Sequence, residues 1–263
     1  MKRSTYVAAV LTAVLALAVA AARAQSPPPV AAAKAVAAVD PGAMAALNNM
    51  GTYLRTLKAY GVEVWTSTEE VLDNGQKSSL DGVTQLVVQM PDRLRVEVKN
   101  DRQDRQYLYN GKEFTLYGAR VGYYATVPAP PTLRQLVDRL EEKYGISVPL
   151  VDLFLWGAAG SNAADAITVA TDLGPSQIEG TTCQHYAFRQ DGLDWQAWIQ
   201  KGDFPLPRKL VLTTTTDEAR PQFTAVYTWN LAPSFNDAAF TFDPPSDAQR
   251  ILLAELPAAG ARK

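Results

Sequence analysis

The residue types best suited to nucleophilic or metal chemistry are scarce in this chain. It has one cysteine and one histidine, Cys183 and His185, which lie two residues apart. On a strand the two side chains would share a face and could share a proton or a metal ion. Two ligands make a poor zinc site, however, and a Cys-His pair needs a thiol of low pKa in an electropositive pocket. The pair therefore favours a structural or surface role. A hydrolase built around His185 stays open as an alternative.

Acidic side chains on the expected strands offer a second kind of chemistry. Glu63, Glu97, Glu179 and Asp194 could pair as the two carboxylates of a glycosidase, but strand faces always offer such pairs. The sequence contains no Gly-x-Ser-x-Gly elbow, His-Glu-x-x-His helix, phosphate-binding glycine loop or EF-hand spacing. We therefore expect a protein that is not an enzyme and that has no catalytic residue, metal or cofactor.

Aromatic side chains on the expected strands give a richer signal. They are Trp65, Tyr107, Tyr109, Trp195, Trp198, Tyr227, Trp229 and Phe242. Any one of them alone is typical of a packed core. As a set they support a hydrophobic cavity.

The stretch from 181 to 212 predicts three successive antiparallel strands. Tyr186 and Phe188 fall on one face of the first strand, and alternating apolar residues mark the second. Asp191-Gly192 is a tight turn, and the two prolines at 205 and 207 form a stiff corner that cannot join a ladder. This pattern indicates architecture, and it does not identify a ligand.

The remaining chain predicts strands, then helices, then strands. In chain order we expect a helix at 40–57, a meander of strands from 60 to 127, helices at 131–144 and 149–156, a loop at 157–164, strands at 167–171, 177–182 and 222–231, a short strand at 240–242 and a terminal helix at 247–256. The fold class is mainly β (α+β), with helices that cover the open face of an antiparallel sheet.

The first residues predict export. Lys2 and Arg3 precede an apolar run from 7 to 20, and Ala22-Arg23-Ala24 fits a signal peptidase site. That run of about 14 residues is shorter than the roughly 20 needed to span a bilayer. We expect a signal peptide at 1–24, a Pro/Ala-rich linker at 25–39, a single domain at 40–256 and a tail at 257–263. The mature protein would be soluble and periplasmic.

The charge balance argues against a nucleic-acid partner. Removing Lys2, Arg3 and Arg23 from the 25 basic residues leaves 22 against 27 acidic residues. A chain that binds phosphates needs an excess of basic side chains on one surface. We therefore expect no nucleic acid among its partners.

Several longer motifs resemble one known family. They are Gln89-Met90-Pro91-Asp92-Arg93-Leu94-Arg95, Leu108-Tyr109-Asn110-Gly111-Lys112, Cys183-Gln184-His185-Tyr186-Ala187-Phe188, Asp194-Trp195-Gln196 and Pro205-Leu206-Pro207-Arg208-Lys209. Together they are similar to the predicted periplasmic proteins grouped as DUF2092, whose layout is similar to the lipoprotein carriers of the LolA/LolB type. The resemblance spans roughly 40–256.

That resemblance implies a half-barrel sheet with helices over an apolar cavity that receives acyl chains. The carriers' Pro-x-x-Phe-Arg pattern corresponds to residues 91–95 here, which implies that Arg95 lies near the cavity mouth. On this basis we expect the ligand-binding residues to be Trp65, Val88, Leu94, Arg95, Val96, Tyr109, Trp195, Tyr227 and Trp229.

We therefore expect a non-catalytic carrier of a lipid-like or other hydrophobic ligand, such as an acyl chain. The alternative is a cell-envelope protein that docks a protein partner and has a packed interior, and a hydrolase is the third hypothesis. A cavity between sheet and helices distinguishes the first from the second.

Overall fold

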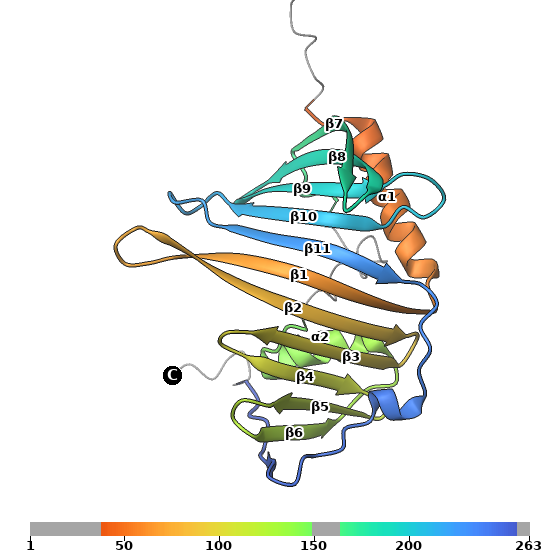
Figure 1. Ribbon diagram of the computed structural model, residues 1–263, viewed down its shortest axis with the longest axis vertical. Helices are drawn as coiled ribbons and strands as arrows, with labels where there is room; N and C mark the ends of the chain where they lie inside the picture. Colours follow the sequence, from red (N-terminus) through yellow and green to blue (C-terminus); the bar gives the residue numbers. More distant parts are fainter. Residues whose placement is uncertain (1–37, 149–163, 257–263) are drawn as a thin grey trace, which may run out of the picture. The chain divides into compact units, whose positions relative to one another are not determined.

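A twelve-stranded sheet runs through the computed structural model, which describes residues 38–148 and 164–256 (Figure 1). The strand order is β12-β6-β5-β4-β3-β2-β1-β11-β10-β9-β8-β7, and every neighbouring pair is antiparallel except β12 with β6. The strands are β1 (Ala59–Val71), β2 (Lys77–Gln89), β3 (Arg93–Asn100), β4 (Asp104–Tyr109), β5 (Glu113–Gly118), β6 (Tyr123–Pro128), β7 (Val169–Ile178), β8 (Thr181–Gln190), β9 (Leu193–Gln200), β10 (Pro207–Thr214), β11 (Gln222–Asn230) and β12 (Gln249–Arg250).

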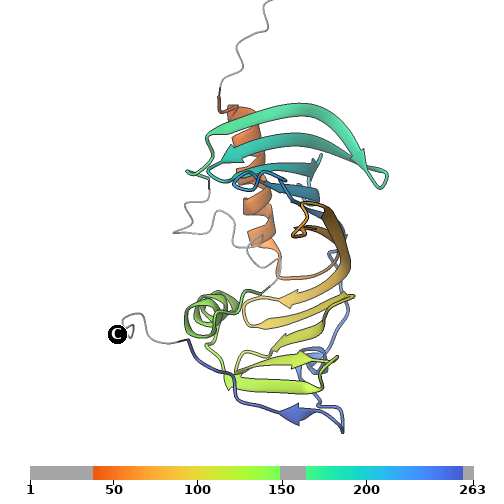
Figure 2. The same ribbon diagram turned by 90° about the vertical axis from the view of Figure 1, so that its left-hand side faces the viewer.

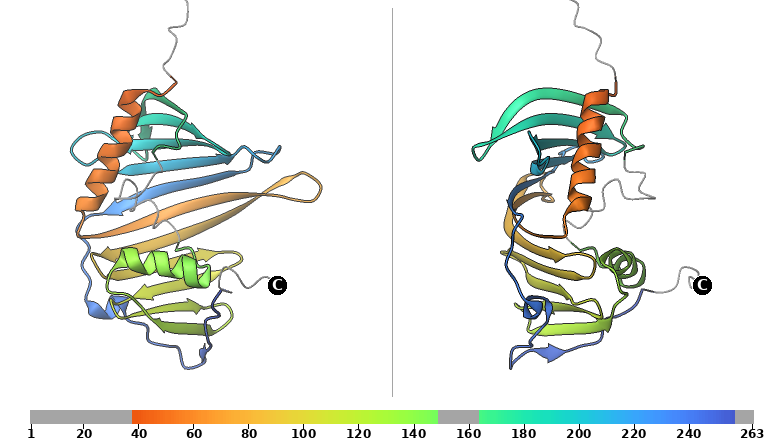
Figure 3. Two further views of the ribbon diagram at one scale, coloured as in Figure 1. Left: turned by 180° about the vertical axis from the view of Figure 1, so that it is seen from behind. Right: turned by 90° about the vertical axis from the view of Figure 1, so that its right-hand side faces the viewer.

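Two meanders meet at the centre of this sheet. β1 to β6 form one meander and β7 to β11 the other, and β1 pairs with β11 to join them. In that pairing Val64 lies opposite Tyr227, and Trp65 lies opposite Val226. The sheet is curved, and both α-helices of the described chain lie on the same face of it (Figures 2 and 3). We call this the inner face.

Helix α1 (Pro41–Thr56) covers the β7–β10 half of the inner face (Figure 3). The Asp40 carboxylate accepts hydrogen bonds from the backbone N–H groups of Gly42 and Ala43, and Pro41 starts the first turn, so the helix begins where the sequence predicts. Its buried residues recur at helical spacing and pack against β8 and β9. They are Ala43, Leu47, Met50, Gly51 and Leu54.

Helix α2 (Leu133–Tyr144) covers the other half. Thr132 caps its N-terminus, and Gly145 ends it in the left-handed conformation at φ 63°, which glycine adopts without steric cost. Leu136 and Leu140 are buried against the strands from β1 to β5. The two helices thus stabilise two core clusters on one face of one sheet.

The chain after β11 crosses to the opposite, outer face. A short 3₁₀ helix, η1 (Asp237–Phe240), contacts β3, and the Phe240 side chain is buried. The Phe242 ring packs between Tyr117 and Tyr124, with ring centroids 5.2 and 5.0 Å apart. The outer face of β3–β6 is therefore covered by this segment.

The predicted elements agree with most of the observed ones. The expected helices at 40–57 and 131–144 are confirmed as α1 and α2, and the expected meander is confirmed as β1 to β6. The strands expected at 167–171 and 177–182 form a single β7 followed by the start of β8, because an irregularity between Asp172 and Gly174 lets the ladder continue past Pro175.

Two predictions near the C-terminus are wrong. The expected strand at 240–242 is instead the last residue of η1 followed by irregular chain. The Phe240 ring packs against Phe235 and the Phe242 ring against Tyr117, and neither residue pairs with a strand. The expected helix at 247–256 is the short strand β12 and irregular chain. Here the Gln249 N–H donates to Gly122 O and the Ile251 N–H to Tyr124 O, which satisfies the free edge of β6. The expected signal peptide, nearly all of the linker, the helix at 149–156, nearly all of the loop at 157–164 and the tail lie outside the described residues.

Candidate ligand-binding site

A row of mostly small side chains crosses the inner face at the centre of the sheet. Cross-strand pairing aligns Ala197, Leu210, Ala225, Thr66, Gly82 and Asn100 from β9 to β3. A Cβ atom added at Gly82 would lie 2.8 Å from the carbonyl oxygen of Lys99. The backbone of β3 is therefore too close to β2 at this position for a larger residue. Small side chains in this row leave space above the sheet.

A pocket of about 490 Å³ occupies that space, in the size range of small-molecule sites. It includes residues of both core clusters, so it lies where the cover of α1 meets that of α2. The described lining residues are Leu47, Met50, Thr66, Thr68, Thr84, Val98, Asn100, Gln103, Gln190, Leu193, Trp195, Ala197, Pro207, Leu210, Leu212, Phe223 and Tyr227. We call it the central pocket.

Apolar side chains from the helix and the sheet form the walls of the central pocket. Leu47 and Met50 reach it from α1, and Leu212 and Phe223 lie opposite each other on β10 and β11. Trp195 adds a ring from β9. Removing apolar surface from water is the main source of affinity that such walls offer, at roughly 25 cal/mol per Å².

Uncharged polar side chains form the other part of the lining. Thr66, Thr68 and Thr84 carry hydroxyls, and Asn100, Gln103 and Gln190 carry amides. The Asn100 side-chain oxygen accepts hydrogen bonds from the backbone N–H groups of Arg102 (2.8 Å) and Gln103 (2.9 Å), which fixes its orientation. The central pocket is therefore amphipathic.

Tyr227 adds a buried donor to this lining. Its side chain is 2% exposed, and its hydroxyl has no hydrogen-bond partner in the described structure. The phenol is protonated at neutral pH, and burial raises its pKa further. A buried hydroxyl without a partner costs roughly 1–3 kcal/mol, which an oxygen atom of a ligand could recover.

The structure brings two of the nine predicted site residues to the central pocket, Trp195 and Tyr227. Val88, Leu94, Val96 and Tyr109 belong to the core cluster under α2 and are at most 1% exposed. Trp229 packs against both clusters and donates from Nε1 to Pro207 O at 2.9 Å.

Trp65 and Arg95 lie on the outer face, so their expected place at the cavity is corrected. Trp65 follows the inner-facing Val64 on β1 and is 57% exposed. Arg95 lies between the inner-facing Leu94 and Val96, where its Nε donates to Glu97 Oε1 at 2.7 Å. Successive residues of a strand point to opposite faces, which is why neither side chain reaches the central pocket.

Sequence reasoning missed most of the lining. The apolar stripe of α1 already marked Leu47 and Met50 as facing a sheet, and alternation placed Phe223 on the face of Tyr227. Alternation from Val64 also put Thr66 and Thr68 on the inner face of β1. Only the pairing of β1 with β11, two strands far apart in sequence, brings them into one pocket with residues of the second meander.

The side chains of Cys183 and His185 point to the outer face of the sheet from β8, away from the central pocket. Cys183 is buried and its thiol donates to Thr181 O. The His185 ring stacks on Trp198, with centroids 3.9 Å apart, and Nε2 lies 2.9 Å from the Gln196 side-chain oxygen. Within residues 38–148 and 164–256, the partners resolved for this imidazole include no carboxylate or hydroxyl, so a hydrolase triad is not assembled there.

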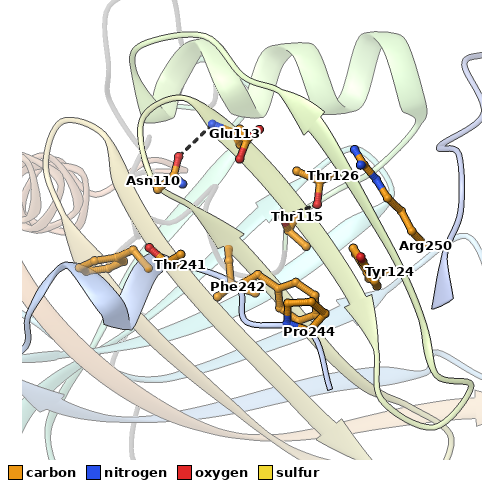
Figure 4. Close-up of a pocket in the computed structure, with 11 residues that line it drawn as sticks. Asn110, Glu113, Thr115, Tyr124, Thr126, Thr241, Phe242, Pro244 and Arg250 are labelled. Atoms are coloured by element: carbon orange, nitrogen blue, oxygen red, sulfur yellow. Dashed lines mark hydrogen bonds between the residues drawn. The ribbon is translucent and has the colours of Figure 1, made fainter. Parts of the chain in front are cut away.

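A second, smaller pocket of about 240 Å³ lies on the outer face under the segment after β11 (Figure 4). Thr115 and Thr126 face each other across β5 and β6, with their hydroxyl oxygens 2.8 Å apart, and Arg250 and Phe242 come from the covering segment. Its mixed polar lining and small volume fit an acyl chain less well than the central pocket does.

In the described residues the architecture is a curved, open, mainly antiparallel sheet with two α-helices on one face. The family described as "Predicted periplasmic protein (DUF2092)" matches residues 43–254, and the chain belongs to this family. This confirms the resemblance drawn from the motifs.

Solved structures of similar layout differ widely in sequence. An uncharacterised conserved protein from Thermus thermophilus is 13% identical, with a TM-score of 0.46, 80% of this chain covered and 99% of that one. LprF from Mycobacterium bovis is 14% identical, with a TM-score of 0.43 and coverages of 81% and 100%. A LolA superfamily protein from Nitrosomonas europaea is 11% identical, with a TM-score of 0.35 and coverages of 76% and 97%. A comparison with curated proteins found no match.

Across the described ranges, no helix has both the length and the apolar character needed to cross a membrane.

Proposed function

We propose that the protein binds a lipid-like or otherwise hydrophobic ligand in the central pocket and acts as a non-catalytic periplasmic carrier. The observation that carries this proposal is the pocket itself, an amphipathic space of about 490 Å³ between sheet and α1. A filled interior would instead favour the alternative function, a cell-envelope protein that docks a protein partner.

Burial of apolar surface supplies the binding energy in this proposal. Each methylene removed from water contributes about 0.8 kcal/mol, so one chain of modest length binds with useful affinity. Leu47 and Met50 make α1 part of the wall, so release would require α1 to move away from the sheet. Residues 1–24 would direct export as a signal peptide, and the mature protein would act in solution.

A pocket-filling variant tests the proposal. Thr66 lines the central pocket, and Ser67, its neighbour on β1, faces outward. Thr66→Trp should place an indole in the pocket and abolish binding of the uncharged probe N-phenyl-1-naphthylamine. Ser67→Trp adds the same ring to the other face and should leave the Kd of the probe unchanged. Equal binding by wild type and Thr66→Trp, or no binding by wild type, would refute the proposal.

A second candidate function, docking of an envelope protein, is favoured by one outer-face observation. Trp65 is 57% exposed, and cross-strand pairing aligns it through Val226 with Lys209 and Trp198. A photocrosslinking residue placed at Trp65 should then capture a periplasmic partner, whereas the same residue at the exposed turn position Glu179 should not. Equal labelling from both positions would remove this candidate.

A further inference from the structure

The described lining of the central pocket contains polar groups but no charged side chain. Among its described lining residues the polar side chains are threonines, amides and a tyrosine, and none is Asp, Glu, Lys, Arg or His. An ionised headgroup inside such a lining would lose its hydration without meeting an opposite charge. Hydroxyl and amide groups instead suit esters, alcohols and amides, which need hydrogen bonds alone.

Two arginines lie near the polar lining, and neither is one of the lining residues. Arg102 donates its backbone N–H to Asn100, but its guanidinium pairs with Glu70, so the two charges offset each other. Arg105 lies opposite Val98 on β4 and so on the same inner face, but it is exposed and is not one of the lining residues. An anionic headgroup would therefore find no free cation inside the pocket formed by the described residues.

Tyr227 indicates what the head of the ligand carries. Tyr227 is one of the residues that line the central pocket, and its buried, protonated hydroxyl has no acceptor in the described structure. A tyrosine hydroxyl donates one hydrogen bond, and a carbonyl or hydroxyl oxygen accepts it. The amides of Gln103 and Gln190 can donate to further oxygen atoms.

Together these features assign a ligand class, and the assignment rests on the function proposed above. We infer that the occupant of the central pocket is a neutral amphiphile, an acyl or alkyl chain attached to an uncharged, oxygen-bearing head such as a glycerol ester or a fatty alcohol. Free fatty-acid anions and anionic phospholipids bind more weakly, because their charge stays unpaired.

Competition between matched lipids tests this assignment. Monomyristoylglycerol and myristate carry the same acyl chain and differ in the charge of the head. Both are titrated at pH 8, below their critical micelle concentrations, against bound N-phenyl-1-naphthylamine. Monomyristoylglycerol should displace the probe at a concentration at least about ten-fold lower than myristate does. Equal or better competition by myristate would overturn the assignment while the probe still reports a working hydrophobic site. Failure of the probe to bind wild type would overturn both proposals.

Two substitutions sharpen the same experiment. Tyr227→Phe keeps the ring and removes the donor, so the ratio of the Kd of monomyristoylglycerol to the Kd of the probe should rise about five-fold. Thr68→Lys adds a cation to the lining and should move the preference toward myristate, whereas Ser67→Lys, on the outer face, should not. An unchanged ratio of these two Kd values in Tyr227→Phe, or an unchanged preference in Thr68→Lys, would count against the neutral, hydrogen-bonded head.

Discussion

Phe188 on β8 and Trp195 on β9 lie opposite each other on the inner face, with ring centroids 4.2 Å apart and ring planes inclined by 26°. Phe188 is buried and is not one of the pocket's lining residues, whereas Trp195 lines the central pocket. The stacked pair therefore links the core under α1 to the wall of the binding site, since the position of one ring limits the other.

Loss of the Phe188 ring should affect stability and binding together. Phe188→Leu keeps an apolar side chain but removes the stacking surface, so the free energy of unfolding in urea should fall by about 1.5 kcal/mol. Trp195 should then be less well held, and the Kd of N-phenyl-1-naphthylamine should rise several-fold. Phe204→Leu, at a ring that is 51% exposed, provides the control and should change stability by less than about 0.5 kcal/mol. A stable Phe188→Leu variant with unchanged binding would contradict this linkage.

Replacement of Arg95 should leave ligand binding intact and loosen the segment after β11. The Arg95 guanidinium pairs with Glu97 and donates from Nη1 to Ala239 O at 3.2 Å on the outer face. In Arg95→Gln, hydrogen exchange should become faster at Ala239 to Phe242, because this anchor of the segment is lost. The Kd of the naphthylamine probe should match that of wild type. Weaker binding would place Arg95 at the pocket after all.

Local signals predicted much of the fold. Asp40 with Pro41 and the apolar stripe that follows set α1 to within about a residue, because capping and helical period are encoded by neighbours in sequence. Asn110-Gly111 predicted the β4–β5 hairpin, where Gly111 has a φ of 85° and the Asn110 side chain accepts from the N–H groups of Lys112 and Glu113.

The site was harder to predict than the fold. The central pocket depends on the pairing of β1 with β11, which no local pattern encodes. Alternation, on the other hand, was available: Leu94, Arg95 and Val96 are consecutive on one strand and cannot all face one cavity. The same rule separates Trp65 from Val64. The terminal helix failed because an apolar pattern cannot show that the free edge of β6 will take up residues 249–251.

His185 gives the protein a pH dependence that can be isolated, since the chain has no other histidine. Burial lowers the pKa of this imidazole below its ordinary value of 6.5, the Gln196 hydrogen bond opposes that shift, and the nearby Lys209 adds to it. Below pH 6.5 the unfolded chain takes up the proton first, so the contribution of His185 to stability is present above that pH and is lost as the pH falls.

Urea unfolding at pH 7.5 and pH 5.5 measures this effect. Wild type should lose more stability between these two values than His185→Gln, in which the titrating group is gone. An NMR titration of the imidazole in folded wild type should give a pKa below 6.5. A pKa at or above this ordinary value would contradict the half-buried position of His185 against Trp198.

The central claim is that the central pocket holds a hydrophobic ligand. Native mass spectrometry of the protein purified from the periplasm, followed by denaturing extraction and analysis of the released lipids, tests it most directly. The account predicts a mass above that of the mature chain, a stoichiometric neutral amphiphile in the extract, and loss of both in Thr66→Trp but not in Ser67→Trp. A bare chain mass for wild type, with no uptake of N-phenyl-1-naphthylamine afterwards, would contradict the account.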